Sequence, residues 1–241
     1  MKRNQLARFL LPSALILCAA LAWADDRNLQ HKYGSLPKAG WQKAADEKFI
    51  SAMDEDYHGD RKKASDDMAA RGWQYLRAGD HSDAMRRFNQ SWLLNNDNGT
   101  ALWGMAAIEA DAGKFDESLK LFAEAEEFVG GEINFSVDYA NAVAVAGVKR
   151  RNQGLLDDAF SRFERIYQIA PQNARNLKNW ATTLFSLKRY TEAWAKVKLA
   201  EALPNGMALI PASWQRCSRE CRDHETSVTF RSLAINPHYT H

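Results

Sequence analysis

The sequence predicts an all-α protein in which antiparallel helix pairs stack into a solenoid, and internal repetition is the main reason. Two pairs of segments repeat with a period of 34 residues within each pair: 65–98 with 99–132, and 140–173 with 174–204. The offset places Gly79 on Gly113 and Phe88 on Phe122. Small residues and aromatics that recur at this period are typical of helix–turn–helix repeats, in which each repeat buries its apolar face against its neighbours.

Composition is the second observation. The 241 residues are 46% hydrophobic and 11% aromatic, which is enough apolar material for a buried core. Basic and acidic side chains nearly balance, at 32 and 30. A protein with general affinity for nucleic acid would carry a basic stripe, so no nucleic-acid partner is predicted.

The first 24 residues have the features of a cleaved signal peptide. Three basic residues open the chain, Lys2, Arg3 and Arg8, and residues 9–21 are almost wholly apolar. Ala22 and Ala24 are the small residues that a signal peptidase recognises, so we expect cleavage after Ala24 and a periplasmic or secreted protein. Removing three basic and no acidic residues lowers the formal net charge from +2 to −1.

No membrane anchor is expected in the mature chain. The apolar run of the leader is shorter than the roughly 20 residues that span a bilayer, and no other segment approaches that length. Cys18 could carry a lipid, but the residue before it, Leu17, is bulky where lipid-modified cysteines follow small residues. We therefore expect neither a membrane span after cleavage nor lipid on Cys18.

Residues 25–64 are predicted to form an N-terminal arm and a capping helix. Gly34 and Pro37 interrupt a polar stretch, so residues 25–40 are expected to be a loose arm. A helix is expected over residues 38–56, where apolar residues recur every three or four positions: Trp41, Ala45, Phe49 and Met53.

The first repeat is expected to pair a helix over residues 63–78 with one over 82–94. Gly79 should make the turn between them, because glycine accepts the left-handed conformation of a helix end. Gly113 should do the same in the second repeat. The third repeat is offset by about seven extra residues near 133–139, which either lengthen its first helix or bulge out as a loop.

With these features the chain resembles the tetratricopeptide-repeat (TPR) family, whose repeat places small residues at positions 8, 20 and 27 and aromatics at 17 and 24. The small positions are filled, repeat by repeat, by Gly72, Ala84 and Ser91; Ala106, Ser118 and Ala125; Gly147 and Ala159; and Ala181, Ala193 and Ala200. His81 departs from the aromatic position 17 and Ile166 from the small position 27. The resemblance implies a right-handed superhelix of about four repeats with flanking helices.

The resemblance also implies a concave groove, lined by the first helix of each repeat, that binds a peptide or protein segment. At its N-terminal end we expect Trp73, Arg77 and Trp103. Large aromatics on a groove can anchor a partner, although packing into the core is the alternative interpretation of the same side chains.

A second group of groove residues is expected toward the other end: Arg151, Asn152, Arg175 and Lys178. Basic and amide side chains can hold a carboxylate through charge-assisted hydrogen bonds. The group does not reproduce the family's clamp for C-terminal carboxylates, and a solvated charged face is the alternative.

Residues 205–241 are expected to form a C-terminal capping helix and a loose tail. Cys217, Cys221 and His224 follow one another at intervals of four and three residues. The two thiols could pair as a disulfide or stay inert, or all three side chains could contribute to a metal site, although zinc takes four ligands. A redox or metal role through this cluster is the alternative to a binding function.

No enzyme is predicted. The chain has no Gly-rich phosphate loop, no zincin helix motif and no nucleophile elbow, so neither a catalytic residue nor a cofactor is expected. The sequence predicts a non-enzymatic scaffold of the bacterial cell envelope that binds a peptide or protein segment. It does not predict an oligomeric state.

Overall fold

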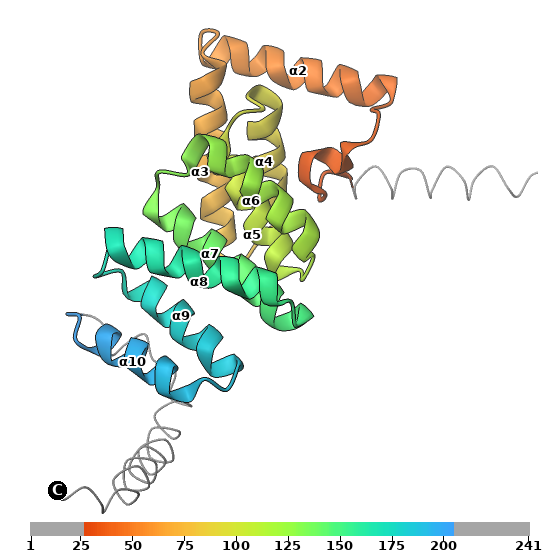
Figure 1. Ribbon diagram of the computed structural model, residues 1–241. Coiled ribbons are helices and arrows are strands. Elements are labelled where there is room, and N and C mark those ends of the chain that lie inside the picture. Colours follow the sequence, from red (N-terminus) through yellow and green to blue (C-terminus); the bar gives the residue numbers. More distant parts are fainter. Residues whose placement is uncertain (1–26, 205–241) are drawn as a thin grey trace, which may run out of the picture. The chain divides into compact units, whose positions relative to one another are not determined.

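In the computed structural model, which describes residues 27–204, all regular secondary structure is helical (Figure 1). A short 3-10 helix, η1 (His31–Ser35), precedes nine α-helices within this range: α2 (Gly40–Asp56), α3 (Arg61–Arg77), α4 (His81–Leu94), α5 (Gly99–Asp111), α6 (Phe115–Val129), α7 (Ile133–Arg150), α8 (Gln153–Ile169), α9 (Ala174–Ser186) and α10 (Tyr190–Glu201). Among the helices of residues 27–204, none combines the length and the apolar character that crossing a membrane requires.

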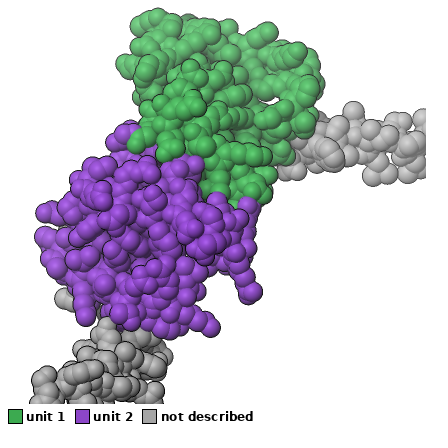
Figure 2. All heavy atoms as spheres, viewed as in Figure 1, with its two compact units in different colours: residues 1–130 green, residues 131–241 purple. Residues whose placement is uncertain are grey.

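The chain divides into two compact units, residues 1–130 and 131–241, which are described separately (Figure 2). In unit 1, α3 packs along α4 and α5 along α6, and α5 also contacts α3 and α4. In unit 2, α7 packs along α8 and α9 along α10, and α9 also contacts α7 and α8. Each unit thus contains two successive helix pairs, as the 34-residue period predicts.

A left-handed residue lies in the turn of every one of these four helix pairs. Gly79 and Gly113 have φ of 81° and 74°, so the predicted glycine turns are confirmed. Arg151 and Lys188 take the equivalent places in unit 2, two residues before the next helix, with φ of 51° and 60°. Because a Cβ atom disfavours this conformation, unit 2 holds backbone strain where unit 1 has glycine.

Phe88 of α4 is the centre of the core of unit 1. Its side chain is fully buried and fits a slot made by two glycines, one on α3 and one on α5. A Cβ atom on Gly72 would lie 2.5 Å from the Phe88 ring, and one on Gly104 only 2.1 Å from it. The absence of both side chains is therefore what lets α3, α4 and α5 approach one another around the ring.

In unit 2, α7 accommodates the extra residues that shift the register of the third repeat. It has 18 residues, whereas α5 and α9 have 13 each. Of the two alternatives, the lengthened helix is therefore correct and the loop is not. The core of this unit stacks Phe163 on Trp180, with ring centroids 6.0 Å apart, and the buried Asn176 amide donates to the Phe163 carbonyl at 3.0 Å.

The predicted apolar stripe of α2 is only half correct. Phe49, Ile50, Met53 and Tyr57 pack against a cluster of Ala64, Met68 and Leu94. The first half of the helix makes no such contact: Ala45 is exposed, and Trp41 is 62% exposed. The period identified the helix, but only its C-terminal half packs against this apolar cluster.

The expectation of a loose arm is wrong for the described residues 27–40, because this segment folds back onto unit 1. η1 packs against α4. The Arg27 guanidinium donates to the Gln42 side chain at 3.2 Å, and Lys38 pairs with Asp46, so the segment is also tied to α2. Burial, with a further contribution from the Asp46 carboxylate, raises the pKa of the Tyr33 phenol well above its usual range.

The glycine slot makes a direct prediction. Gly104→Ala should lower the free energy of unfolding by about 1–3 kcal/mol, because the added methyl group would overlap the Phe88 ring. Urea unfolding followed by circular dichroism measures this. Gly40→Ala is the matched control, since a Cβ atom there would meet nothing within 4 Å. Equal stability of both variants would contradict the slot.

Candidate functional site

Trp73 on α3 and Trp103 on α5 lie side by side in unit 1. Their ring centroids are 4.7 Å apart and the rings meet edge to face at 63°. Both side chains are half-buried, so part of each ring system is exposed to solvent. The structure therefore brings together the two aromatics that the sequence analysis placed on one surface.

Trp73 is also part of the framework of the unit. Its indole N–H donates to the Thr100 carbonyl at 3.1 Å, and its ring packs edge-on against Phe88 at 5.8 Å. The hydrogen bond links α3 to the first turn of α5. Trp73 thus packs against the core of unit 1, while its side chain remains half-exposed.

Small residues continue the same side of α5 beyond Trp103. Ala107 and Ala110 follow at helical spacing, and both are half-exposed. We call Trp73, Trp103, Ala107 and Ala110 the tryptophan face. It is an apolar surface with two tryptophans at one end and two alanines at the other.

Charged side chains border the tryptophan face. Arg77 is exposed at the end of α3, four residues after Trp73 and so on the same side of the helix. Asp111 is exposed at the end of α5, and its carboxylate lies 3.7 Å from the His81 ring nitrogen. The apolar surface is therefore bordered by one guanidinium and one carboxylate.

The basic group predicted in unit 2 is not one cluster. The Arg175 guanidinium pairs with the Asp138 carboxylate at 2.9 Å and donates to the Asn134 carbonyl at 3.0 Å. Arg151 follows the last residue of α7, thirteen residues after Asp138, which corresponds to roughly 20 Å along the helix. The lengthening of α7 thus separates the two arginines.

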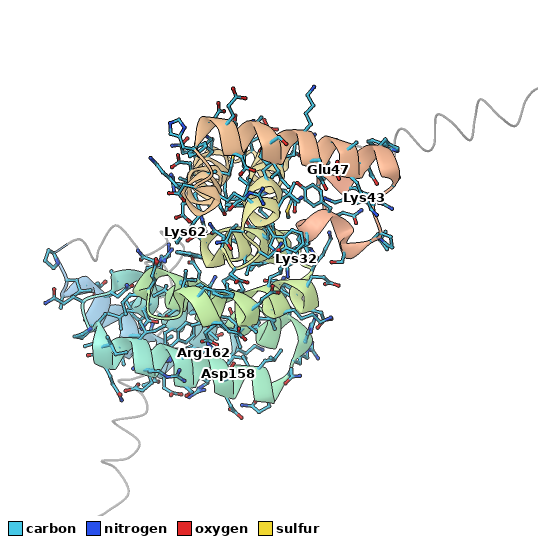
Figure 3. The ribbon with its side chains drawn as sticks, turned by 90° about the horizontal axis from the view of Figure 1, so that it is seen from above. Lys32, Lys43, Glu47, Lys62, Asp158 and Arg162 are labelled. Carbon is cyan, nitrogen blue, oxygen red and sulfur yellow. The ribbon has the colours of Figure 1, made fainter. Side chains whose placement is uncertain are left out.

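The other two members of that group have local roles. The Asn152 side-chain oxygen accepts a hydrogen bond from the Leu155 N–H, so this residue caps the N-terminus of α8. Lys178 is half-buried on α9. On α8, Asp158 pairs with Arg162 at 3.1 Å, and the Arg162 guanidinium lies over the Tyr139 ring of α7; Asp158 and Arg162 are labelled in Figure 3. A carboxylate clamp is not assembled here.

A polar site on α4, α5 and α6 was not predicted from the sequence. Asn89 and Glu109 are buried there, and Glu124 is half-buried. The Asn89 amide donates to the carbonyls of Asn28 and Gln30, at 3.0 and 2.8 Å. A glutamate within the otherwise apolar α5 was the signal in the sequence that could have revealed this site.

Glu109 is the best-connected carboxylate of that site. Its Oε1 accepts a hydrogen bond from His31 Nδ1 at 2.9 Å, and Lys114 Nζ lies 3.1 Å from its Oε2. The hydrogen bond from His31 is the main cause that holds the pKa of Glu109 below its usual value; Lys114 adds to the effect, and burial opposes it. The ionised form is therefore the one that the fold stabilises.

The C-terminal candidates Cys217, Cys221 and His224 lie outside the described residues, as do the leader and Cys18. Within residues 27–204, no group of three or more His, Cys, Asp or Glu side chains is arranged to hold a metal ion.

Glu109 should make stability depend on pH in a defined direction. Because its pKa is lowered in the folded state, its contribution is present above the unfolded-state value of about 4.3 and is lost as the pH falls through the folded-state value. Glu109→Gln should cost about 1–3 kcal/mol at pH 6, and the difference from wild type should shrink toward pH 3. Urea unfolding at several pH values measures it, with the exposed Glu127→Gln as control. A difference that is independent of pH would contradict the role of the charge.

No family model matches the chain. Over 108 residues, 44% of its length, it is 32% identical to the protein CTR9 homolog of Arabidopsis thaliana, and this match covers 9% of that protein. The chain thus corresponds to a small part of the relative.

The fold has a solved counterpart. A crystal structure of a thermophilic TPR protein from Thermus thermophilus superimposes with a TM-score of 0.53, at 19% sequence identity, over 58% of this chain and 75% of that one. At this identity the likeness concerns the fold alone. Together with the helix pairs described above, it shows that this chain has an all-α, TPR-like fold.

Proposed function

We propose that the chain is a non-enzymatic scaffold that binds a segment of another protein on the tryptophan face of unit 1. The observation that carries the proposal is the Trp73–Trp103 pair, which is half-exposed and held by contacts within the unit. TPR-like folds suggest protein-binding scaffolds, and paired aromatics are the side chains that most often dominate such interfaces.

The chemistry of the face indicates what it would bind. An apolar side chain of the partner would pack on the exposed edges of the two indoles, because aromatic contacts bury much surface with little loss of side-chain freedom. Ala107 and Ala110 leave space for the partner's backbone along α5. Arg77 would pair with an acidic residue or a terminal carboxylate at the end of that segment.

The framework of the face is held in place before any partner binds. The Trp73 N–H is fixed on the Thr100 carbonyl, and its ring is fixed against Phe88. A preformed surface loses less conformational entropy on binding, which favours affinity. This argument supports a binding role for unit 1 alone, and it needs no residue of unit 2.

We place this scaffold in the cell envelope of a bacterium. The proposal rests on the leader, with its three basic residues, its apolar run and the small residues Ala22 and Ala24.

A bulky substitution tests whether a partner binds on the tryptophan face. Ala107→Arg introduces a long side chain onto the tryptophan face, whereas Ala123→Arg makes the same change at an exposed position of α6. A photoreactive residue at position 111, which is exposed beside the tryptophan face and leaves both tryptophans in place, should cross-link a partner segment, identified by mass spectrometry. We expect Ala107→Arg to reduce the cross-linked yield at least tenfold, roughly 1.4 kcal/mol of binding, and Ala123→Arg to leave it unchanged.

The interpretation of tryptophan variants needs a stability control. Trp73→Ala would remove a hydrogen bond and packing against Phe88 as well as exposed surface, so its unfolding free energy must be measured beside its binding. Trp73→Phe retains a ring and loses the N–H. Equal cross-linking by the photoreactive chain with and without Ala107→Arg, with both folded, would disprove binding on this face.

Export makes a separate prediction. The intact mass of the purified protein should match a chain that begins at Asp25, because cleavage is expected after Ala24. Ala24→Phe should block cleavage and leave the precursor, since the peptidase requires a small residue there. A purified wild-type protein that retains residues 1–24 would contradict this assignment.

A further inference from the structure

We propose that a polar recess on α4, α5 and α6 is a binding site for a short basic turn, and that the chain's own N-terminal arm fills it as an intramolecular ligand. The arm recess consists of Asn89, Trp92, Glu109 and Glu124, and the arm comprises residues 27–36. Displacement of the arm would open the recess to a partner segment of the same chemistry, a turn with adjacent histidine and lysine. This inference does not depend on the tryptophan face.

The recess recognises the backbone of the arm through Asn89. This side chain is fully buried, and both hydrogen bonds from its amide nitrogen go to arm carbonyls, those of Asn28 and Gln30. Its own oxygen has no hydrogen-bond partner among the described residues. The NH2 group of this buried amide therefore has its hydrogen-bond partners in the arm, and the side chain is positioned to bind the arm.

The recess recognises two consecutive side chains by charge. His31 donates to the buried Glu109, and Lys32 Nζ donates to Glu124 at 2.6 Å. Lys32 also lies over the Trp92 ring, 5.8 Å from its centroid. Lys114 compensates part of the charge of Glu109, which leaves the recess acidic toward the arm. The two carboxylates and the Trp92 ring thus favour two consecutive basic residues.

The backbone of the arm indicates that the recess imposes its shape. Four consecutive residues have positive φ: Lys32, Tyr33, Gly34 and Ser35, at 50°, 56°, 73° and 52°. Only glycine adopts this conformation without a steric penalty, and successive left-handed residues are rare. The turn is therefore not a local preference of the sequence. Tertiary contacts stabilise it: Lys32 is held in the recess, and Tyr33 is half-buried beside Asp46 of α2.

The recess lies apart from the tryptophan face. Glu109 follows Trp103 by six residues on α5, roughly one and two-thirds helical turns, so the two side chains leave the helix in different directions. The remaining recess residues come from α4 and α6, and none of them belongs to the tryptophan face. The two surfaces can therefore be tested independently, and the failure of one leaves the other intact.

Charge reversal in the full chain tests whether the arm is held this way. Lys32→Glu and Glu124→Lys should each raise the hydrogen-exchange rates of the amides of residues 28–36 at least tenfold, since each places like charges together. The double variant should restore slow exchange. Lys43→Glu makes the same charge change on the exposed surface of α2 and should have no effect (Figure 3). Unaltered exchange in both single variants, or no rescue in the double variant, would overturn the proposal.

Binding in trans tests whether the recess is a site for a separate segment. The probe is a fluorescent peptide of residues 27–36, titrated against the full chain by fluorescence anisotropy. The Lys32→Glu chain should bind it at least tenfold more tightly than wild type, whose own arm occupies the recess. Adding Glu109→Gln to Lys32→Glu should abolish this gain, and so should a peptide with both His31→Ala and Lys32→Ala.

The remaining outcomes are also decisive. If Lys32→Glu fails to fold by circular dichroism, Lys32→Ala replaces it, because it removes the ion pair without reversing the charge. No peptide binding to a folded arm-weakened chain would overturn the proposal. Equal binding to chains with and without Glu109→Gln would do the same, because the peptide would then bind elsewhere.

Discussion

The insertion of the Phe88 ring between Gly72 and Gly104 is the contact on which the rest of unit 1 depends. It sets the approach of α3, α4 and α5, and that approach places Trp73 against Trp103. Trp73 touches Phe88 on one side and Trp103 on the other, so the tryptophan face is continuous with the core. The core contact and the surface that we propose for binding are therefore one packed arrangement.

The helices and their turns could be predicted from the sequence because their causes are local. A 34-residue period and glycine turns depend on residues close together in the chain, and the eight helices from α3 to α10 follow that pattern. Predictions failed where the cause was distant. Asn89 meets the carbonyl of Asn28 across 61 residues, and Lys32 meets Glu124 across 92, so no local pattern predicts that the arm is held.

The candidate site was predictable to a similar extent. Family positions correctly placed Trp73 beside Trp103, because both lie on first helices at fixed repeat positions. The same family positions grouped Arg175 with Arg151, whereas Arg175 pairs with Asp138. Repeat positions take no account of the extra length of α7. The role of Asn152 was in fact readable, because an asparagine directly before a helix is a common N-cap.

The glycine slot has a consequence for how this sequence can change over time. A side chain at Gly104 destabilises the fold while Phe88 keeps its ring, because the two would overlap. A mutation that enlarges one position is less costly after a mutation that shrinks the other. Related chains should therefore show these two positions varying together: a larger residue in place of Gly104 should accompany a smaller one in place of Phe88, with Trp73 then losing its support.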